Sequence, residues 1–212
     1  MEAFEELAAR TLPPGYRIEW TGMAFQEREA GNTAFLAYGL ALIFVYLFLV
    51  AQYESWSIPF AIILVVPMAI GGAIAALLLT GVALNLYAQI GVVLLIGMAA
   101  KNAILIVEFA RHRREQQGEE IIGAAREAGR LRFRAVCMTA VSFILGILPL
   151  VFASGAGAFG QRSLGITVFG GMLAALLVGT FFIPGFYAIV QGVRERLKHK
   201  LGMTNIVGGK EQ

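Results

Sequence analysis

Hydrophobic residues gather in five long blocks that polar segments separate. The blocks cover residues 33–52, 58–80, 85–110, 135–153 and 164–191. A helix needs about 20 mostly apolar residues to span a bilayer, and each block is about that long. Only the third block carries charged residues, Lys101 and Glu108. The pattern predicts an all-α bundle of five transmembrane helices.

The first 32 residues are more polar and have a different pattern. Apolar residues recur there at helical spacing, at Phe4, Leu7, Ala8 and Leu12. Pro13-Pro14-Gly15 then ends the helix, and apolar and polar residues alternate over residues 16–21 as in a strand with one buried face. One helix and one strand cannot form a core alone. We therefore expect residues 1–32 to be a short α/β remnant at the end of an external domain.

Basic residues are unevenly divided between the two sides of such a bundle. The segment between the third and fourth blocks holds seven arginines, and the segment after the fifth block holds five arginines and lysines. The other side holds four: Arg10, Arg17, Arg28 and Arg162. By the positive-inside rule, residues 111–134 and the basic tail 192–212 are cytoplasmic and the N-terminus is outside. Because no signal peptide precedes the exported segment, we expect a C-terminal piece of a longer polypeptide, or a truncated one.

Composition supports a membrane protein. Hydrophobic residues make up 58% of the 212 residues and charged residues 15%, against about half and about a quarter in an average soluble domain. This excludes an ordinary soluble globule, a disordered chain and a nucleic-acid-binding module. The formal charge of +3 follows from cytoplasmic segments alone. The one cysteine, Cys137, excludes an internal disulfide framework and a multi-cysteine metal site.

Signatures of enzymes are absent from the sequence. There is no H-E-x-x-H, G-x-S-x-G or P-loop motif. The two histidines, His112 and His199, lie in the predicted cytoplasmic segments. The five blocks also lack the paired acids or Ser/His set that an intramembrane hydrolase needs. We expect no catalytic residue, metal site or cofactor.

Lys101 is the strongest indication of function. It lies deep in the third block, where a lysine costs roughly 3 kcal/mol or more unless it pairs or reaches water. Nine residues separate it from Ala110, about 13 Å of helix, which disfavours snorkelling to the interface. Glu108 is about 10 Å away along the axis and cannot pair with it directly. The pattern favours a buried cation whose carboxylate partner comes from another part of the protein, as in proton relays.

Two residues near the fourth block have simpler interpretations beside a functional one. Thr139 lies inside the cytoplasmic end of the block, and its hydroxyl is expected to bond to its own helix. Arg132 lies just before the block and suits a positive-inside anchor as well as a functional role. The segment 111–134 has a weak apolar stripe, which fits a surface helix and a solvated connector equally.

Four motifs make the chain recognisable. They are Tyr-Arg-Ile-Glu-Trp-Thr-Gly at 16–22, Tyr-Glu-Ser-Trp-Ser-Ile-Pro at 53–59, Gly-Met-Ala-Ala-Lys-Asn-Ala-Ile-Leu-Ile-Val-Glu-Phe-Ala at 97–110, and the segment from Met138-Thr139 to Pro149. In this order and spacing they resemble the resistance–nodulation–division superfamily, and most closely its hydrophobe/amphiphile multidrug efflux branch. The resemblance extends to about Arg196. It implies the last part of such a pump: the end of a periplasmic porter subdomain, then the eighth to twelfth transmembrane helices.

The resemblance implies an activity and partners. Pumps of this branch export drugs and other amphiphiles, driven by the proton motive force without a cofactor. They are homotrimers of the bacterial inner membrane that work with a periplasmic adaptor and an outer-membrane channel. Two aspartates on the fourth helix take up protons, and a lysine on the tenth helix pairs with them. A threonine of the eleventh helix and an arginine just before it also belong to this proton relay. Lys101 matches the lysine, and Thr139 and Arg132 match the threonine and the arginine.

The chain also departs from the family pattern. The fourth-helix aspartates and the drug-binding domains are absent, so we expect no proton coupling from this chain alone. Ala135 stands where the family usually has a proline, a mild change at a first helical position. Lys101-Asn102 argues against the heavy-metal branch. The alternatives are a non-transporting remnant or split-gene subunit that packs with a partner half, and an intramembrane enzyme, for which the helices lack polar groups.

Overall fold

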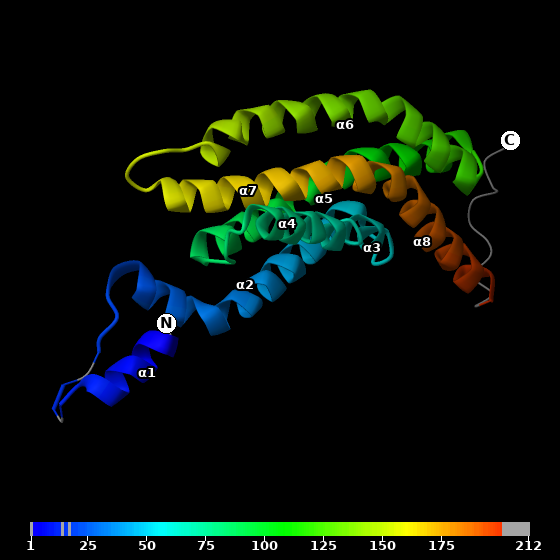
Figure 1. The fold of residues 1–212 in the computed structure, drawn as a ribbon. Coiled ribbons are helices and arrows are strands. Elements are labelled where there is room, and N and C mark those ends of the chain that lie inside the picture. The colour runs from blue at the N-terminus through cyan, green and yellow to red at the C-terminus, as the bar shows by residue number, and fades with distance from the viewer. Residues whose placement is uncertain (1, 14, 17, 201–212) are drawn as a thin grey trace, which may run out of the picture.

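The computed structural model describes residues 2–13, 15, 16 and 18–200, and over these residues the protein is all-α. The elements in chain order are α1 Glu2–Thr11, α2 Gly22–Tyr53, α3 Ile58–Ile63, α4 Val66–Thr80, α5 Leu86–Gln117, α6 Ile121–Val151, α7 Ala158–Ala174, the π-helical turn η1 Ala175–Gly179 and α8 Thr180–Lys200. Helices α2 to α8 form an elongated bundle, and α1 lies beside the start of α2 (Figure 1).

Five segments in the described part are long and apolar enough to cross a membrane. They are Phe35–Tyr53, Ile58–Thr80, Leu86–Gln117, Ile121–Val151 and Ala158–Glu195. Each contains most or all of one predicted block, so the prediction of five long apolar helical segments, each a candidate membrane span, is confirmed. Residues 192–200 of the predicted tail continue α8, and residues 201–212 lie outside the described residues.

The basic segment between the third and fourth blocks is neither a separate surface helix nor a solvated connector. α5 continues to Gln117 and α6 begins at Ile121, so only three residues connect them. Gly118 adopts a left-handed φ of 65° that ends α5. Arg111 pairs with Glu115 one turn later at 2.8 Å, which supports the helix beyond its apolar part. The arginines therefore lie on extensions of two transmembrane helices.

Two spans depart from a regular α-helix near a proline. Pro67 has no N–H for the carbonyl of Ile63, and the helix is broken between α3 and α4 at residues 64–65. The last span contains Pro184 in α8 and the π-turn η1 before it. Figure 1 shows α8 bending away from the line of α7 after this turn.

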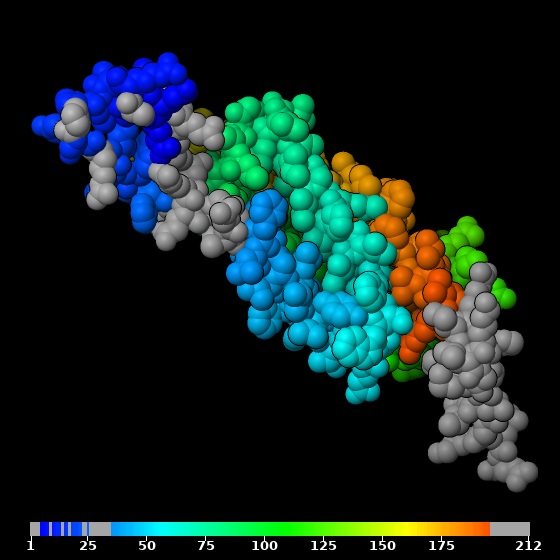
Figure 2. Space-filling model, turned by 90° about the horizontal axis from the view of Figure 1, so that it is seen from below, coloured from blue at the N-terminus to red at the C-terminus, as the bar shows by residue number. Residues whose placement is uncertain are grey.

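Helix α5 is the central element of the bundle. It contacts α2, α3, α4, α6, α7 and α8, and 56% of its apolar window is buried, against 6% for α2. Figure 2 shows α2 lying along one face of the bundle with its outer side uncovered. Phe35, Phe44 and Phe48 of α2 are 79%, 68% and 66% exposed. Helix α5 is thus placed where several helices meet. Lys101 itself is exposed, so the described residues do not enclose the buried cation that the sequence predicts.

Helices α4 and α7 approach closely through glycine. A Cβ on Gly72 would meet Ala174 and lie 2.8 Å from the carbonyl oxygen of Gly170. A Cβ on Gly170 would meet Ala76 and lie 2.9 Å from the carbonyl oxygen of Gly72. Real Cβ atoms do not come this near to backbone, so this contact requires glycine on both helices.

The strand predicted at residues 16–21 is not formed at the described positions 16 and 18–21, although the preceding helix is present as α1. A strand needs a neighbouring strand to bond its backbone groups, and the described residues contain none. Trp20 instead donates its indole N–H to Glu5 of α1 at 2.9 Å. The structure therefore shows no α/β remnant; Pro14 and Arg17 of this segment lie outside the described residues.

Candidate functional site

Lys101 and Thr139 line the same pocket. This pocket, of about 450 Å³, lies where α5, α6 and α7 meet. Its lining residues are Met98, Lys101, Asn102, Met138, Thr139, Ala140, Ser142, Phe143 and Met172. The central helix α5 thus presents its lysine to the helix that carries the threonine. These two of the three expected site residues are brought together.

The hydroxyl groups in this pocket donate to their own helix. Thr139 Oγ1 donates to the carbonyl oxygen of Val136 at 3.1 Å, and Ser142 Oγ donates to that of Met138 at 2.8 Å. This back-bonding is the arrangement expected for Thr139. A hydroxyl oxygen that donates its proton still has lone pairs to accept a hydrogen bond. Both oxygens are therefore suited to accept from a cation in the pocket.

Asn102 is the polar residue that the sequence reasoning missed as a site residue. It is only 4% exposed, and its amide Nδ2 has no hydrogen-bond partner among the described residues. Leaving a buried donor unpaired costs about 1–3 kcal/mol. Its signal in the sequence was an amide directly after the deep lysine. The pocket thus combines a cation, two hydroxyls and an amide that lacks a partner.

No carboxylate in the described part of the chain pairs with Lys101. The ion pairs of the bundle join Arg111 to Glu115, Arg113 to Glu119 and Arg114 to Glu195. All three lie in the basic extensions of α5 and α8 and the turn that follows α5. The ammonium of Lys101 therefore still requires a negative partner if it is to stay charged at membrane depth.

Glu108 is engaged with α2 instead. The hydroxyl of Tyr53 donates to Glu108 Oε2 at 3.5 Å. Arg111 donates to the carbonyl oxygen of Tyr53 at 3.1 Å, and its guanidinium lies 5.8 Å from the ring centre of Tyr53. These contacts fasten the end of α2 to α5 and leave Glu108 apart from Lys101.

Arg132 is not among the residues that line the Lys101 pocket. It lies seven residues before Thr139, about 10 Å along α6. Its guanidinium stacks over Phe109 of α5, 4.5 Å from the ring centre. A cation over an aromatic face is attracted by the ring quadrupole. The structure thus gives Arg132 a contact between the two helices of the site but not a place in the pocket.

Other chemistry is not supported by the described residues. They contain no group of three or more His, Cys, Asp or Glu side chains that could hold a metal ion. Cys137 is a half-buried free thiol packed against the core cluster that includes Ala140 and Ile144. The arrangement can stabilise and move a positive charge, but it offers no nucleophile with an adjacent base.

Comparison with known proteins agrees with the motifs. Residues 1–191 match the model of the AcrB/AcrD/AcrF family. The multidrug resistance protein MdtF of Escherichia coli is 44% identical over 198 residues, 93% of this chain and 19% of its own length. The toluene efflux pump membrane transporter TtgB of Pseudomonas putida is 46% identical over 188 residues, 89% of this chain and 18% of its own.

The chain therefore spans about a fifth of the length of these curated relatives. Its match covers α1 to most of α8, including the pocket of Lys101 and Thr139. The family consists of efflux transporters rather than enzymes. The chain belongs to the AcrB/AcrD/AcrF family of resistance–nodulation–division transporters.

Proposed function

We propose that this chain forms the C-terminal part of a proton-driven multidrug exporter of the bacterial inner membrane and carries the lysine side of its proton relay. The observation that carries the proposal is Lys101: a cation on the central helix, in a pocket with Thr139, that no carboxylate of the described residues neutralises. The names of the relatives, multidrug and toluene efflux transporters, support apolar and amphiphilic drugs as substrates.

The relay needs acids from elsewhere in the pump. In the family pattern these are the two aspartates of the fourth transmembrane helix, which lie outside this chain. When they are ionised, the ammonium of Lys101 is held by them. When they are protonated, the attraction falls, and the flexible lysine stem swings toward the hydroxyl oxygen of Thr139. Proton binding thus biases a two-state element, which is what coupling requires.

Arg132 acts in this proposal as a positioning residue. Its contact with Phe109 joins α6 to α5, eight residues from Lys101 on the same helix. The swing of the Lys101 side chain toward Thr139 changes the contacts between α5 and α6 at the pocket. The stacked pair is therefore suited to carry that change toward the basic end of the bundle.

The proposal includes a membrane orientation and a division of the chain. Residues 1–32 belong to the end of a periplasmic porter subdomain, residues 33–191 to the membrane domain and residues 192–212 to a cytoplasmic tail. The arginines gathered on the connected ends of α5 and α6 support this orientation. The working pump is a homotrimer that includes the aspartate-bearing half and operates with a periplasmic adaptor and an outer-membrane channel.

The test is substitution of Lys101 in the pump that contains this chain. We expect Lys101→Ala to abolish drug resistance while membrane expression and trimer yield stay normal, because two neighbouring acids without a counter-charge hold a proton. Lys101→Arg should fail as well, since a planar fork does not replace a mobile point charge. Arg162→Ala, an exposed basic residue on α7, serves as the matched control. Normal resistance with Lys101→Ala would overturn the relay.

A further inference from the structure

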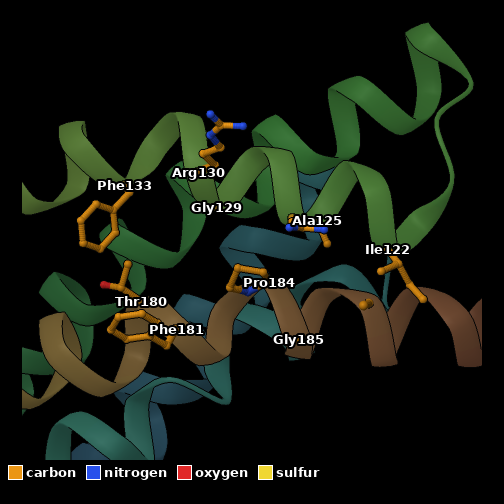
Figure 3. Close-up of a pocket in the computed structure, with 11 residues that line it drawn as sticks. Ile122, Ala125, Gly129, Arg130, Phe133, Thr180, Phe181, Pro184 and Gly185 are labelled. Atoms are coloured by element: carbon orange, nitrogen blue, oxygen red, sulfur yellow. The ribbon is translucent and has the colours of Figure 1, made fainter.

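A second pocket lies between α6 and α8, away from Lys101. Its volume is about 580 Å³, and Figure 3 shows it between the first turns of α6 and the first turns of α8. Gly129 lets the two helices meet there, because a Cβ at this position would lie 2.9 Å from the ring of Pro184. Gly129 and Pro184 both line this pocket, which is called the groove below.

The groove is lined by both apolar and basic side chains. Phe133 and Phe181 lie close across the two helices, with ring centres 6.4 Å apart, and they are 45% and 73% exposed. Arg126 and Arg130 also line the groove, one helical turn apart on the same face of α6. The apolar part belongs to the last membrane span, so acyl chains of the bilayer reach it.

Arg126 and Arg130 are available to bind an anion. None of the ion pairs or hydrogen bonds found in the described part of the chain involves Arg126 or Arg130. Their neighbours in the basic extensions, Arg113 and Arg114, are paired with Glu119 and Glu195. Two unpaired guanidinium groups at the edge of an apolar groove suit an anionic headgroup above a hydrocarbon chain.

Thr180, which also lines the groove, provides an independent indication of a ligand there. It is 4% exposed, and its Oγ1 has no hydrogen-bond partner among the described residues. Threonine within a helix ordinarily bonds the carbonyl one turn back, but Thr180 follows the π-turn η1. Pro184, four residues on, also offers no N–H to the carbonyl of Thr180. Figure 3 shows Thr180 between Phe133 and Phe181 at one end of the groove.

We propose that the groove between α6 and α8 binds one anionic phospholipid of the bilayer, with its phosphate on Arg126 and Arg130 and an acyl chain against Phe133 and Phe181. The ester oxygens of the glycerol backbone, which lie between phosphate and chain, are acceptors for the hydroxyl of Thr180. The lipid would join α6 to the helix that follows the π-turn. This site is independent of the proton relay, since none of its residues lines the Lys101 pocket.

The experiment reads lipid contact at the groove itself. The 212-residue chain carries Trp20→Phe, Trp56→Phe and Phe133→Trp, so that its one tryptophan lines the groove, and it is reconstituted in mixed phosphatidylcholine and phosphatidylglycerol bilayers. Brominated phosphatidylglycerol or brominated phosphatidylcholine then quenches the fluorescence. We expect an association constant for phosphatidylglycerol roughly tenfold or more above that for phosphatidylcholine. With Phe152→Trp in place of Phe133→Trp, at a position outside the groove, the two lipids should quench equally.

Substitutions separate the groove from general surface charge. Arg126→Gln with Arg130→Gln should bring the preference at position 133 to about one, whereas Lys at both positions should retain it and Arg162→Gln should leave it unchanged. Gly185→Leu, which fills open space in the groove, should reduce quenching by both lipids; Gly146→Leu, in open space elsewhere on α6, should not. Circular dichroism confirms that each variant is helical. Equal lipid preference at positions 133 and 152, or a preference that survives the double glutamine variant, would overturn the proposal.

Discussion

At the scale of single residues, three of the polar side chains that line the two pockets of the membrane domain lack a partner in the described part of the chain. Lys101 has no carboxylate, Asn102 has no acceptor for its amide, and Thr180 has no acceptor for its hydroxyl, all within the described residues. Such groups are costly in a bilayer and mark functional positions. The first two share one pocket and the third lies in another. The proposed relay and the proposed lipid site therefore occupy different pockets.

Asn102 provides a prediction in which stability and activity change in opposite directions. Asn102→Leu roughly keeps the volume of the side chain and removes an unpaired buried amide. The free energy of unfolding of the isolated chain should therefore stay the same or rise by up to about 1–3 kcal/mol. In the full pump the same change should lower drug resistance, because the pocket of Lys101 then lacks the amide that can donate a hydrogen bond to a relay residue from the rest of the pump. Denaturant titration of the chain and drug susceptibility of the pump measure the two effects. A destabilised chain with an active pump would show that Asn102 is a structural residue only.

At the scale of elements, helix packing depends on where small residues meet backbone. At Gly72 and Gly170 the backbones of α4 and α7 approach so closely that no Cβ atom fits at either position. Gly71, one residue earlier on α4, faces open space. Glycine is therefore required at position 72 but not at position 71. Helical period decides which of the two faces the partner helix.

This pair gives a matched test of the α4–α7 contact. Gly72→Ala should destabilise the chain by about 1–3 kcal/mol, because the added methyl group meets Ala174 and the carbonyl of Gly170. Gly71→Ala should leave stability unchanged or raise it by up to about 1 kcal/mol, since alanine is the better helix former. Both are measured by unfolding in mixed micelles. Equal effects of the two substitutions would mean that α4 and α7 are not held as closely as the structure has them.

At the scale of the whole molecule, the bundle has a basic end and an apolar body. The end of α5, the turn after it and α8 meet in a network in which Arg114 binds Glu195 at 3.0 Å and donates to the carbonyl oxygen of Glu119 at 2.6 Å. This network connects the last helix to the turn between α5 and α6. Charge of this sign and density is ordinarily retained in the cytoplasm.

Topology is therefore a prediction at this scale. In a Cys137→Ser background, Glu119→Cys should be labelled by a membrane-impermeant maleimide only after the cells are opened. Arg162→Cys, at the other end of the bundle, should be labelled in intact cells. Labelling of position 119 from outside would reverse the proposed orientation of all five spans.

Transport by the chain on its own is the other test at this scale. We expect expression of the 212 residues in a pump-deficient strain to leave drug susceptibility unchanged, because no carboxylate in the described residues neutralises Lys101. Co-expression with the aspartate-bearing part of a family member is the positive comparison. Reproducible resistance from the chain alone would show that it needs no partner half to move drugs.

Features that depend on local composition could be predicted before any helix was packed against another. Five apolar blocks became five spans because a bilayer-length run of apolar residues has one low-energy solution, a helix that satisfies its own backbone. The break between α3 and α4 beside Pro67 follows from a missing backbone donor. The depth of Lys101 was equally readable, since it depends on position within a block and not on neighbours.

Features that depend on a neighbour in space required the packed bundle. The alternation at residues 16–21 predicted a strand, but a strand exists only beside another one, and the described part of this chain supplies none. That Thr139 shares a pocket with Lys101 while Arg132 does not depends on the rotation of α6 against α5. The groove of Arg130 and Thr180 joins residues some 50 positions apart that no local pattern connects. Such contacts arise only when side chains of different helices meet, because each helix satisfies its own backbone and leaves its partners unspecified.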